Sequence, residues 1–352
     1  MKDLRDSRRD VFFESRTGRK KSLNEDCYGE AFAAGNDLDF LFVSDGMGGH
    51  LAGEVASGMT CGSLGAAFSG AVFENEDMKK LFIENAIIKA DLEIADDSAS
   101  NPQHSRMGAT LVLAALDLAA GNALVCNIGD SRCYHYGEGG LRQITKDHSL
   151  KQQLIDRGFA PEEIPPEAHR NAVTRAMGFL CTEKGRPRID LYEVPFGKDD
   201  LFILCSDGLT SVLSNETLEK ALAERRGLDS GDICRALADM ACAAGSDDDI
   251  TVAVVRILKT GRGEAGTDGE KAAGTGTGDE KAAENRPAED GTKEPAAREE
   301  TADDNDSREE TADEPAAREE TEETADENSL CGDARDAEPE TEAAAARTAG
   351  LA

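Results

Sequence analysis

The chain has 352 residues, of which 71 are acidic and 39 are basic, so its formal net charge is -32 and no basic patch marks it as a nucleic-acid-binding protein. Most of this net negative charge lies after residue 260, where roughly 29 acidic residues stand against about 10 basic ones and no aromatic residue occurs. Such a segment cannot bury enough apolar surface to fold, so we expect a folded domain over residues 1–259 and a disordered, acidic, low-complexity tail over residues 260–352.

The first half of the folded part alternates between strand and helix patterns. Apolar runs predict strands at Val11–Glu14 and around Tyr28, and a central strand at Leu38–Ser44. A helix of small residues is expected from Glu54 to about Phe68, and a second helix from Asn75. On the second helix, apolar residues fall at helical spacing, and we expect them to face the core: Met78, Leu81, Phe82, Ile88 and Leu92.

From Ala109 the pattern changes to strands joined by short turns. The expected strands are Thr110–Leu118, Ala123–Ile128, Cys133–Tyr136 and Leu141–Thr145. Short links between consecutive strands predict an antiparallel meander. A helix capped by Asp147 or Ser149 follows, then strands near 189–194, 201–205 and 250–258, with helices near 215–225 and 229–243. This order of elements predicts an α+β layered sandwich.

Acidic residues recur where apolar strands end or begin. Asp45-Gly46 follows the central strand, Asp130 and Asp207 follow two later strands, and Asp248 precedes the last one. A carboxylate at such a place is costly unless something pairs with it, and divalent cations need several oxygen ligands from different parts of a fold. The plainer alternatives are that Asp207 and Asp248 cap helices or turns, and that Asp130 is a turn residue paired with Arg132.

The kinds of ligand indicate the chemistry. With Glu25 and Asp26 added, the set contains carboxylates but no Cys or His cluster, which favours Mg²⁺ or Mn²⁺ over zinc. Two such ions about 4 Å apart activate a bridging water for in-line attack on phosphorus. The basic stretch at residues 19–21 lies beside Glu25 and Asp26, so Lys21 or Arg19 is expected to bind the phosphate.

Seven short motifs carry a family resemblance. They are Asn24-Glu25-Asp26, Asp45-Gly46-Met47-Gly48-Gly49-His50, Met107-Gly108-Ala109-Thr110, Gly129-Asp130-Ser131-Arg132, Thr145-Lys146-Asp147-His148-Ser149, Ser206-Asp207-Gly208-Leu209 and Asp248-Asp249-Ile250-Thr251. In this order and spacing, over about residues 10–258, the chain resembles the PPM family of metal-dependent, type 2C serine/threonine protein phosphatases, in particular its bacterial members.

The resemblance implies a four-layer α-β-β-α sandwich of two antiparallel sheets flanked by helices, with a flap over about residues 150–171. It also implies roles for single residues. Asp45 would bridge two ions, the Gly46 carbonyl would bind the second ion, and a third, weaker ion would lie at Asp130 and Asp207. The implied catalytic residues are Asp45, Asp207 and Asp248, and the implied metal ligands are Asp45, Gly46, Asp207, Asp248, Glu25, Asp26 and Asp130.

Three positions depart from the family pattern. Lys21 stands where the family has an arginine that grips the phosphate, and a lysine lacks the bidentate fork. Met47 replaces the histidine of many eukaryotic members, and a methionine cannot protonate a leaving group. Asp249 replaces an asparagine after the last metal ligand, which adds a carboxylate. His50, in the glycine-rich motif, is expected to be structural rather than catalytic.

The resemblance implies a protein phosphatase that hydrolyses phosphoserine and phosphothreonine with a metal-activated bridging water. The alternative is a pseudophosphatase that binds phosphoproteins or a kinase, which only Lys21 and Asp249 favour. We expect phosphorylated proteins as partners, as the substrates of a serine/threonine kinase, with no nucleic acid or membrane involved and with a monomeric chain. Nine scattered cysteines, with no Cys-x-x-Cys pair and no apolar leader segment, predict reduced thiols in a cytoplasmic protein.

Overall fold

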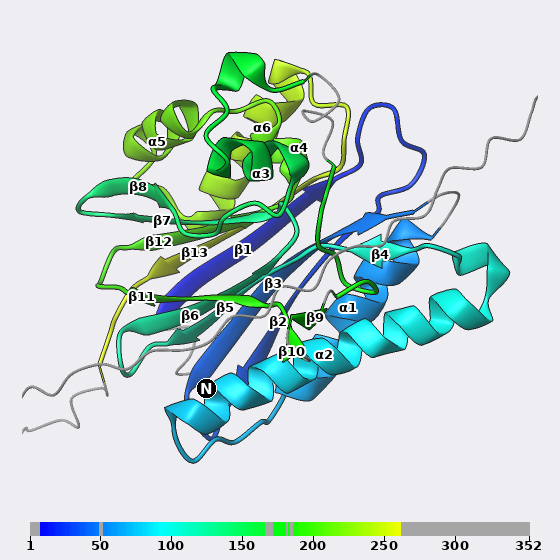
Figure 1. The fold of residues 1–352 in the computed structure, drawn as a ribbon. Helices are drawn as coiled ribbons and strands as arrows, with labels where there is room; N and C mark the ends of the chain where they lie inside the picture. Colours follow the sequence, from blue (N-terminus) through cyan, green and yellow to red (C-terminus); the bar gives the residue numbers. More distant parts are fainter. Residues whose placement is uncertain (1–7, 49–51, 166–171, 181, 184–185, 262–352) are drawn as a thin grey trace, which may run out of the picture. The chain divides into compact units, whose positions relative to one another are not determined.

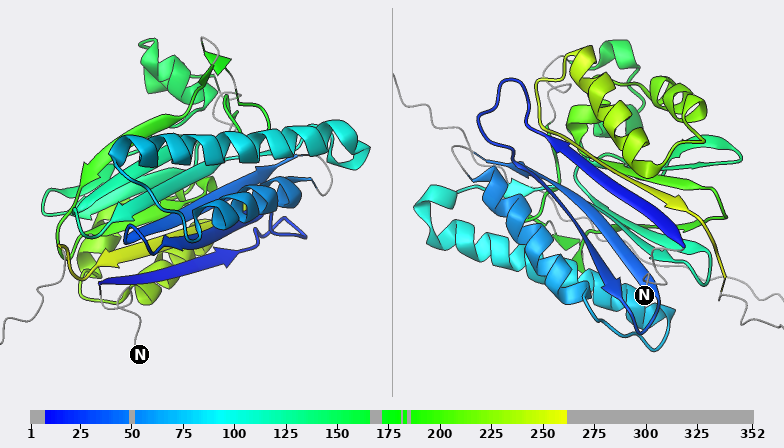
Figure 2. Two further views of the ribbon diagram at one scale, coloured as in Figure 1. Left: turned by 90° about the horizontal axis from the view of Figure 1, so that it is seen from below. Right: turned by 180° about the vertical axis from the view of Figure 1, so that it is seen from behind.

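Two antiparallel β-sheets lie face to face in the computed structural model, and helices cover the outer face of each sheet (Figures 1 and 2). The structure describes residues 8–48, 52–165, 172–180, 182–183 and 186–261, which all belong to one unit spanning residues 1–272. The expected α+β, four-layer sandwich is confirmed. The expected tail over 260–352 lies, apart from its first two residues, outside the described residues.

The first sheet has the strand order β11-β6-β5-β3-β2. Its strands are β2 (Asp26–Ala33), β3 (Leu38–Met47), β5 (Leu111–Asp117), β6 (Asn122–Ile128) and β11 (Asp190–Pro195), and the short β4 (Gly108–Ala109) pairs with the end of β3. Helices α1 (Gly53–Phe68) and α2 (Glu76–Ser100) cover its outer face (Figure 1). The central strand is longer than expected, because it continues past Ser44 through Asp45 to Met47.

The second sheet has the strand order β1-β13-β12-β7-β8. Its strands are β1 (Arg9–Arg16), β7 (Arg132–Gly137), β8 (Gly140–Gln143), β12 (Leu201–Cys205) and β13 (Ile250–Ile257). Helices α4 (Asp207–Thr210), α5 (Asn215–Glu224) and α6 (Ser230–Ala244) lie on its outer side (Figure 1). The remaining short elements are η2 (Pro102–His104), α3 (Leu150–Asp156), η3 (Pro161–Glu163), β9 (Thr182–Glu183) and β10 (Arg186–Pro187).

The expected meander after Ala109 is wrong. Strands β5 and β6 form a hairpin in the first sheet, whereas β7 and β8 form a hairpin in the second. The chain therefore crosses from one sheet to the other between Ile128 and Arg132, although that link is short. This crossing places Asp130 at the edge where the two sheets meet, which no local turn signal indicates.

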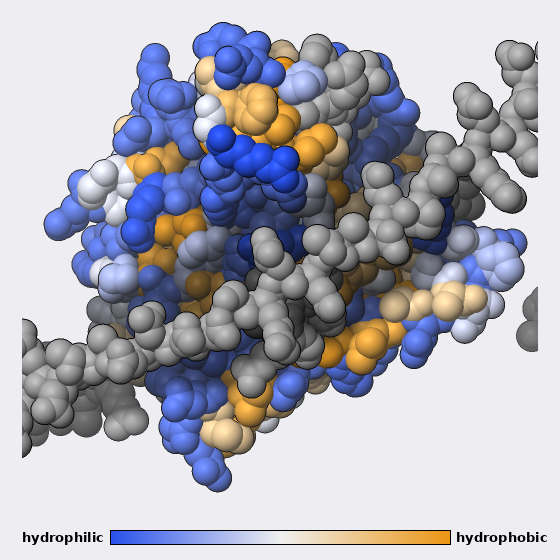
Figure 3. Space-filling view, in the orientation of Figure 1, coloured by the Kyte–Doolittle hydropathy of each residue, from blue (hydrophilic) through white to orange (hydrophobic). Residues whose placement is uncertain are grey.

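The orientation predicted for α2 is also wrong. Of the expected core stripe, Phe82 packs against the core, but Met78, Leu81 and Leu92 are about half exposed. Figure 3 shows hydrophobic residues at the surface along this helix. The buried face carries other apolar residues instead, among them Ile83 and Ile87. The predicted start is confirmed, because the Asn75 side chain accepts a hydrogen bond from Met78 N–H.

The core between the sheets explains where the site lies. Alternate residues of β3 face opposite sides: Phe40 and Phe42 pack toward α1, whereas Leu41 and Val43 pack against the second sheet. Asp45 continues the second series, so its side chain enters the layer between the two sheets at their common edge. No helix within the described ranges combines the length and the apolar character that crossing a membrane requires.

Candidate metal centre

The end of β3 brings Asp45 to the edge of the inter-sheet layer. Its register partner on β2 is Asp26, so two carboxylates start out side by side on neighbouring strands. Thr110 fixes the Asp45 backbone from the other side: Asp45 N–H donates to Thr110 Oγ1 at 2.9 Å, and Thr110 N–H donates to Asp45 O at 2.8 Å. The Asp45 carboxylate therefore projects from a backbone that is held on both edges.

Carboxylates from four other places face Asp45. Burial raises the pKa of Asp45 well above its usual range, and the charges of Asp26, Asp207, Asp130 and Asp248 raise it further. These acids come from β2, the first turn of α4, the link between β6 and β7, and the segment before β13. The structure thus brings together five carboxylates that the sequence places as much as 222 positions apart.

Burial also raises the pKa of three of the other acids in the cluster. Burial raises the pKa of Asp26 to about 7, although hydrogen bonds from Ser206 and Thr251 oppose the rise. Burial and the charge of Asp207 raise the pKa of Asp130 to about 7. Asp207 lies within hydrogen-bonding distance of Asp45, and burial raises its pKa to about 6. At neutral pH the acidic cluster therefore favours binding of a cation, because positive charge offsets the repulsion between the carboxylates.

Two observations test whether a metal ion fits these residues. Asp26 Oδ1 is buried and meets no hydrogen-bond donor among the described residues, so it has unused acceptor capacity. A set of oxygen ligands without Cys or His suits a hard divalent cation. Among the described residues, no three Asp, Glu, His or Cys side chains are arranged to hold an ion as they stand, so binding requires side-chain adjustment.

Gly46 shows how closely the chain approaches itself beside Asp45. A Cβ atom on this residue would lie 2.1 Å from Gly53 O and 2.6 Å from Glu25 O. Gly46 N–H donates to Glu25 O at 3.0 Å, which draws the loop before β2 onto β3. Only glycine fits between the start of α1 and this loop without displacing one of them.

The two candidate phosphate-binding residues lie in different surroundings. Lys21 Nζ contacts Glu25 at 3.0 Å and Asp248 at 2.5 Å, so it lies within the acidic cluster. Burial alone would lower the pKa of Lys21, but its hydrogen bonds to Asp248 and Glu25 outweigh this and raise the pKa above its usual range. Arg19, whose side chain is 62% exposed, instead pairs with Asp247 at 3.1 Å.

The loop that carries Asp130 is braced from behind. Arg132 forms a bidentate pair with Asp147, at 2.8 and 2.6 Å, so the alternative in which Arg132 pairs with Asp130 is wrong. Gly129 N–H donates to Nδ1 of His148 at 3.0 Å, and Nε2 of His148 faces Asp190 at 3.0 Å. His148 therefore fixes the backbone of Gly129, the residue before Asp130.

The expected flap is only partly described. Ser149 caps α3, as predicted, by accepting a hydrogen bond from Gln152 N–H. The structure describes the flap through residue 165, whereas residues 166–171 lie outside the described residues. His50 of the glycine-rich motif also lies outside them. Val173 pairs with Ser149 where the chain returns. The two ends of the excursion are therefore joined next to the brace formed by His148.

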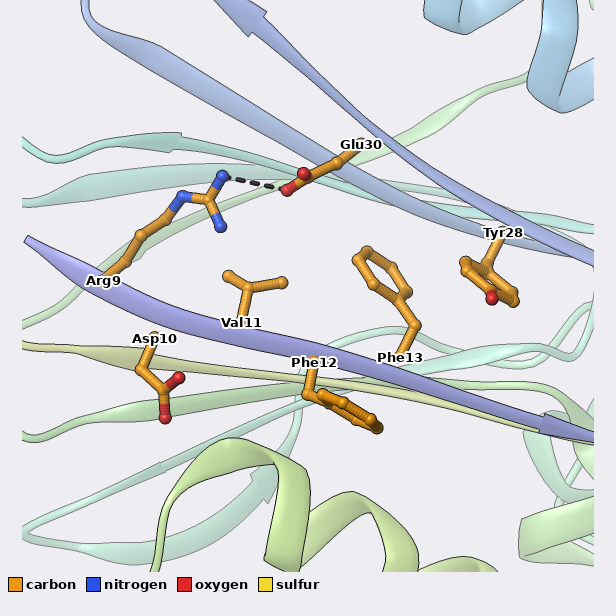
Figure 4. Close-up of a pocket in the computed structure, with 7 residues that line it drawn as sticks. All are labelled: Arg9, Asp10, Val11, Phe12, Phe13, Tyr28 and Glu30. Atoms are coloured by element: carbon orange, nitrogen blue, oxygen red, sulfur yellow. Dashed lines mark hydrogen bonds and ion pairs between the residues drawn. The ribbon is translucent and has the colours of Figure 1, made fainter. Parts of the chain in front are cut away.

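A hollow of about 420 Å³ lies between the edge strands β1 and β2, and none of the residues that line it belongs to the acidic cluster. Figure 4 shows Arg9 paired with Glu30 on one side of it and Phe13 beside Tyr28 on the other. Arg9 also pairs with the buried Asp39 at 2.8 Å. These contacts join the edges of the two sheets, and we assign the hollow no part in the metal centre.

The structure shows partners for two motif residues that the motifs alone do not indicate. Ser206 Oγ donates to Asp26 Oδ2 at 2.7 Å and so ties the start of β2 to the end of β12. Asp249 is 1% exposed and accepts hydrogen bonds from the backbone of the loop before β2. Both residues sit beside a predicted ligand in the sequence, which is the signal that singles them out, but their partners are more than 170 residues away.

The comparisons agree with this geometry. Residues 16–240 match the protein phosphatase 2C family. The serine/threonine phosphatase stp of Listeria monocytogenes is 33% identical over 255 residues, which cover 71% of this chain and 97% of that protein. The S. agalactiae serine/threonine phosphatase superposes with a TM-score of 0.63 at 27% identity, covering 71% and 99% of the two chains.

A mycobacterial structure extends the agreement to another group of bacteria. The Mycobacterium tuberculosis serine/threonine phosphatase PstP/Ppp superposes with a TM-score of 0.59 at 29% identity, covering 71% of this chain and 99% of that one. None of these relatives supports the pseudophosphatase alternative. The chain belongs to the protein phosphatase 2C family, the metal-dependent protein serine/threonine phosphatases.

Proposed function

We propose that this chain removes phosphate from phosphoserine and phosphothreonine of protein substrates with two Mn²⁺ or Mg²⁺ ions held by the acidic cluster. The observation that carries the proposal is the convergence of Asp26, Asp130, Asp207 and Asp248 on the buried Asp45, whose pKa their charges raise. When bound, the ions supply an activated water and neutralise charge that develops on the phosphoryl oxygens.

The position of each acid suggests its role. Asp45, which faces the acids of both sheets, would bridge the two ions, and Asp207 and Asp248 would complete the ligands of the first. The Gly46 carbonyl would serve the second ion, with Glu25 and Asp26 as direct or water-mediated ligands. Asp130 together with Asp207 would hold a third, weaker ion. Asp45, Asp207 and Asp248 are thus the proposed catalytic residues.

The remaining roles concern phosphate and proton transfer. Lys21 is the candidate for phosphate binding because its ammonium lies among the proposed ligands, whereas Arg19 is held on Asp247. Met47 has no titratable group and cannot protonate the leaving group, which would take its proton from water. The expected flap over about residues 150–171 would face the substrate, and its residues 166–171 lie outside the described residues.

The wider setting follows from the proposed chemistry. A protein phosphatase acts on proteins that a serine/threonine kinase has phosphorylated, so such a kinase is the proposed functional counterpart. We propose a cytoplasmic, monomeric enzyme in which residues 1–259 carry the activity and residues 260–352 do not contribute to catalysis. The seven described cysteines are all free and five of them are buried, which supports a reducing compartment.

Phosphate release from a phosphothreonine peptide tests the proposal. Wild-type protein should turn over with Mn²⁺, lose activity in EDTA and regain it when Mn²⁺ is restored. Asp45→Asn should lower the rate by more than about 100-fold, because even residues that only support a metal ligand cost 10–100-fold when removed. The matched control is Asp117→Asn, which lies at the β5–β6 turn and should retain activity. Activity that survives exhaustive chelation, or in Asp45→Asn, would contradict the metal mechanism.

A further inference from the structure

Asp249 is a buried carboxylate whose two oxygens both accept backbone hydrogen bonds. Oδ1 accepts from Gly18 N–H at 2.8 Å, and Oδ2 accepts from Glu25 N–H at 2.8 Å. Its exposed fraction is 1%. The loop that joins β1 to β2 is therefore fastened at both ends to one side chain at the start of β13. Gly18 lies so close that a Cβ atom there would be 2.4 Å from Asp247 O.

The same carboxylate also holds Lys21. Oδ2 of Asp249 lies 3.2 Å from Lys21 Nζ, which in turn lies 3.0 Å from Glu25 and 2.5 Å from Asp248. The ammonium group is thus shared by three carboxylates. Two of them, Glu25 and Asp248, are proposed metal ligands, and only Asp249 is not.

We propose that Asp249 is a positioning residue that restrains Lys21, and so keeps this ammonium from pairing fully with the metal ligands Glu25 and Asp248. The inference rests on the proposed function. Asp249 acts on the site through the Lys21 charge that it shares, and its hydrogen bond from Glu25 N–H holds the loop that carries Lys21. Lys21 and Asp249 then form one charge-matched unit in which neither residue can change alone without cost.

Hydrogen bonding explains why an acid and not an amide occupies this position. Gly18 N–H and Glu25 N–H approach opposite oxygens of the Asp249 side chain, and both are donors. An asparagine has one oxygen and one NH₂ group, so whichever way it turned, its NH₂ would face a backbone N–H. Asn at 249 would also leave Lys21 with only Glu25 and Asp248 as partners, and the ammonium would compete with a cation for both.

Mn²⁺ binding measured by isothermal titration calorimetry, without substrate, tests this coupling. The proteins are wild type, Asp249→Asn, Lys21→Gln and the double variant, each at a temperature where circular dichroism shows it fully folded. Asp249→Asn should weaken Mn²⁺ binding about tenfold, the scale expected when a support of a metal ligand is lost. Lys21→Gln should bind Mn²⁺ as tightly as wild type or more tightly, because a neighbouring positive charge is removed.

The double variant gives the decisive result. Because Lys21→Gln removes the competing ammonium, it should return Mn²⁺ affinity in the Asp249→Asn background to within about threefold of Lys21→Gln alone. The matched control is Asp247→Asn, whose side chain pairs with Arg19 and Lys20 in the same segment. This control should bind Mn²⁺ like wild type, which would show that loss of a nearby acid is not enough.

Three results would overturn the inference. Asp249→Asn that melts at a lower temperature but binds Mn²⁺ like wild type would make Asp249 structural only. Additive effects in the double variant would show that Lys21 is not what Asp249 restrains. A Lys21→Gln protein that loses Mn²⁺ binding would show that Lys21 organises the ligands. This measurement remains informative even if Asp249→Asn does not fold. Wild-type protein that binds no Mn²⁺ would instead overturn the proposed function, and this inference with it.

Discussion

Replacement of Gly46 by alanine is the most informative single perturbation of the site, because it adds one methyl group and changes no charge. The new Cβ would lie 2.1 Å from Gly53 O, which is about 0.9 Å closer than the 3.0 Å below which such contacts essentially never occur. Both neighbours are backbone, so β3, the start of α1 or the Glu25 loop must move by roughly 1 Å. A misplacement of that size costs on the order of 100-fold in rate.

The assay is kcat/KM on a phosphothreonine peptide, together with Mn²⁺ affinity and the melting temperature. Gly46→Ala should lower kcat/KM by about 100-fold and weaken Mn²⁺ binding, because Asp45 and Glu25 flank the contact. Gly58→Ala is the matched control: it lies in α1, nothing is within 4 Å of its Cβ, and the change should stabilise the helix by about 0.5–1 kcal/mol. A Gly46→Ala enzyme within about threefold of wild type in rate and Mn²⁺ affinity would refute this reasoning.

Three further predictions concern parts of the fold around the site. The His148 hydrogen bond lowers the pKa of Asp190, so this carboxylate stabilises the fold at pH 6 and loses that contribution as the pH falls below about 4. Urea unfolding should show that the stability difference between wild type and Asp190→Asn shrinks from pH 6 to pH 3, and a difference independent of pH would contradict this prediction. Ile87→Ala should cost about 2–5 kcal/mol because Ile87 is fully buried, whereas Leu92→Ala should cost less than about 0.5 kcal/mol, as chemical denaturation would reveal; equal costs would contradict the orientation of α2. Truncation after Thr260 should leave the melting temperature and the rate on p-nitrophenyl phosphate unchanged, and a lower melting temperature would show that the acidic tail docks on the domain.

Local patterns predict most elements of this fold, and packing decides what they leave open. Residues that lie next to one another in the sequence predict strands β1, β3 and β13. They also predict the helix caps Asn75 and Ser149. The correct face of α2 does not, because that helix is apolar on two opposite sides and periodicity alone cannot choose between them.

The choice of sheet fails for a related reason. A short link predicts that consecutive strands pair, but Ile128 and Arg132 end up in different sheets, because burial of both hairpins against the common core outweighs the local preference. The same crossing delivers Asp130 to the acidic cluster.

The proposed metal ligands can be picked out from the sequence, whereas their surroundings cannot. Asp45, Asp207 and Asp248 stand out because each follows or precedes an apolar run. The partners of Lys21 are different: Asp248 and Asp249 lie more than 220 residues away, and no local rule connects a basic loop to them. The sequence raised Lys21 and Asp249 as two separate departures, and the structure shows that they contact each other.

Mn²⁺ titration calorimetry of wild type and Asp45→Asn tests whether the converging carboxylates hold divalent metal ions for phosphate hydrolysis. We expect the wild-type protein to bind at least two Mn²⁺ ions. Asp45→Asn, although folded by circular dichroism, should lose tight binding of both, because Asp45 would bridge them. An Asp45→Asn protein that binds the same number of Mn²⁺ ions with unchanged affinity would contradict the claim.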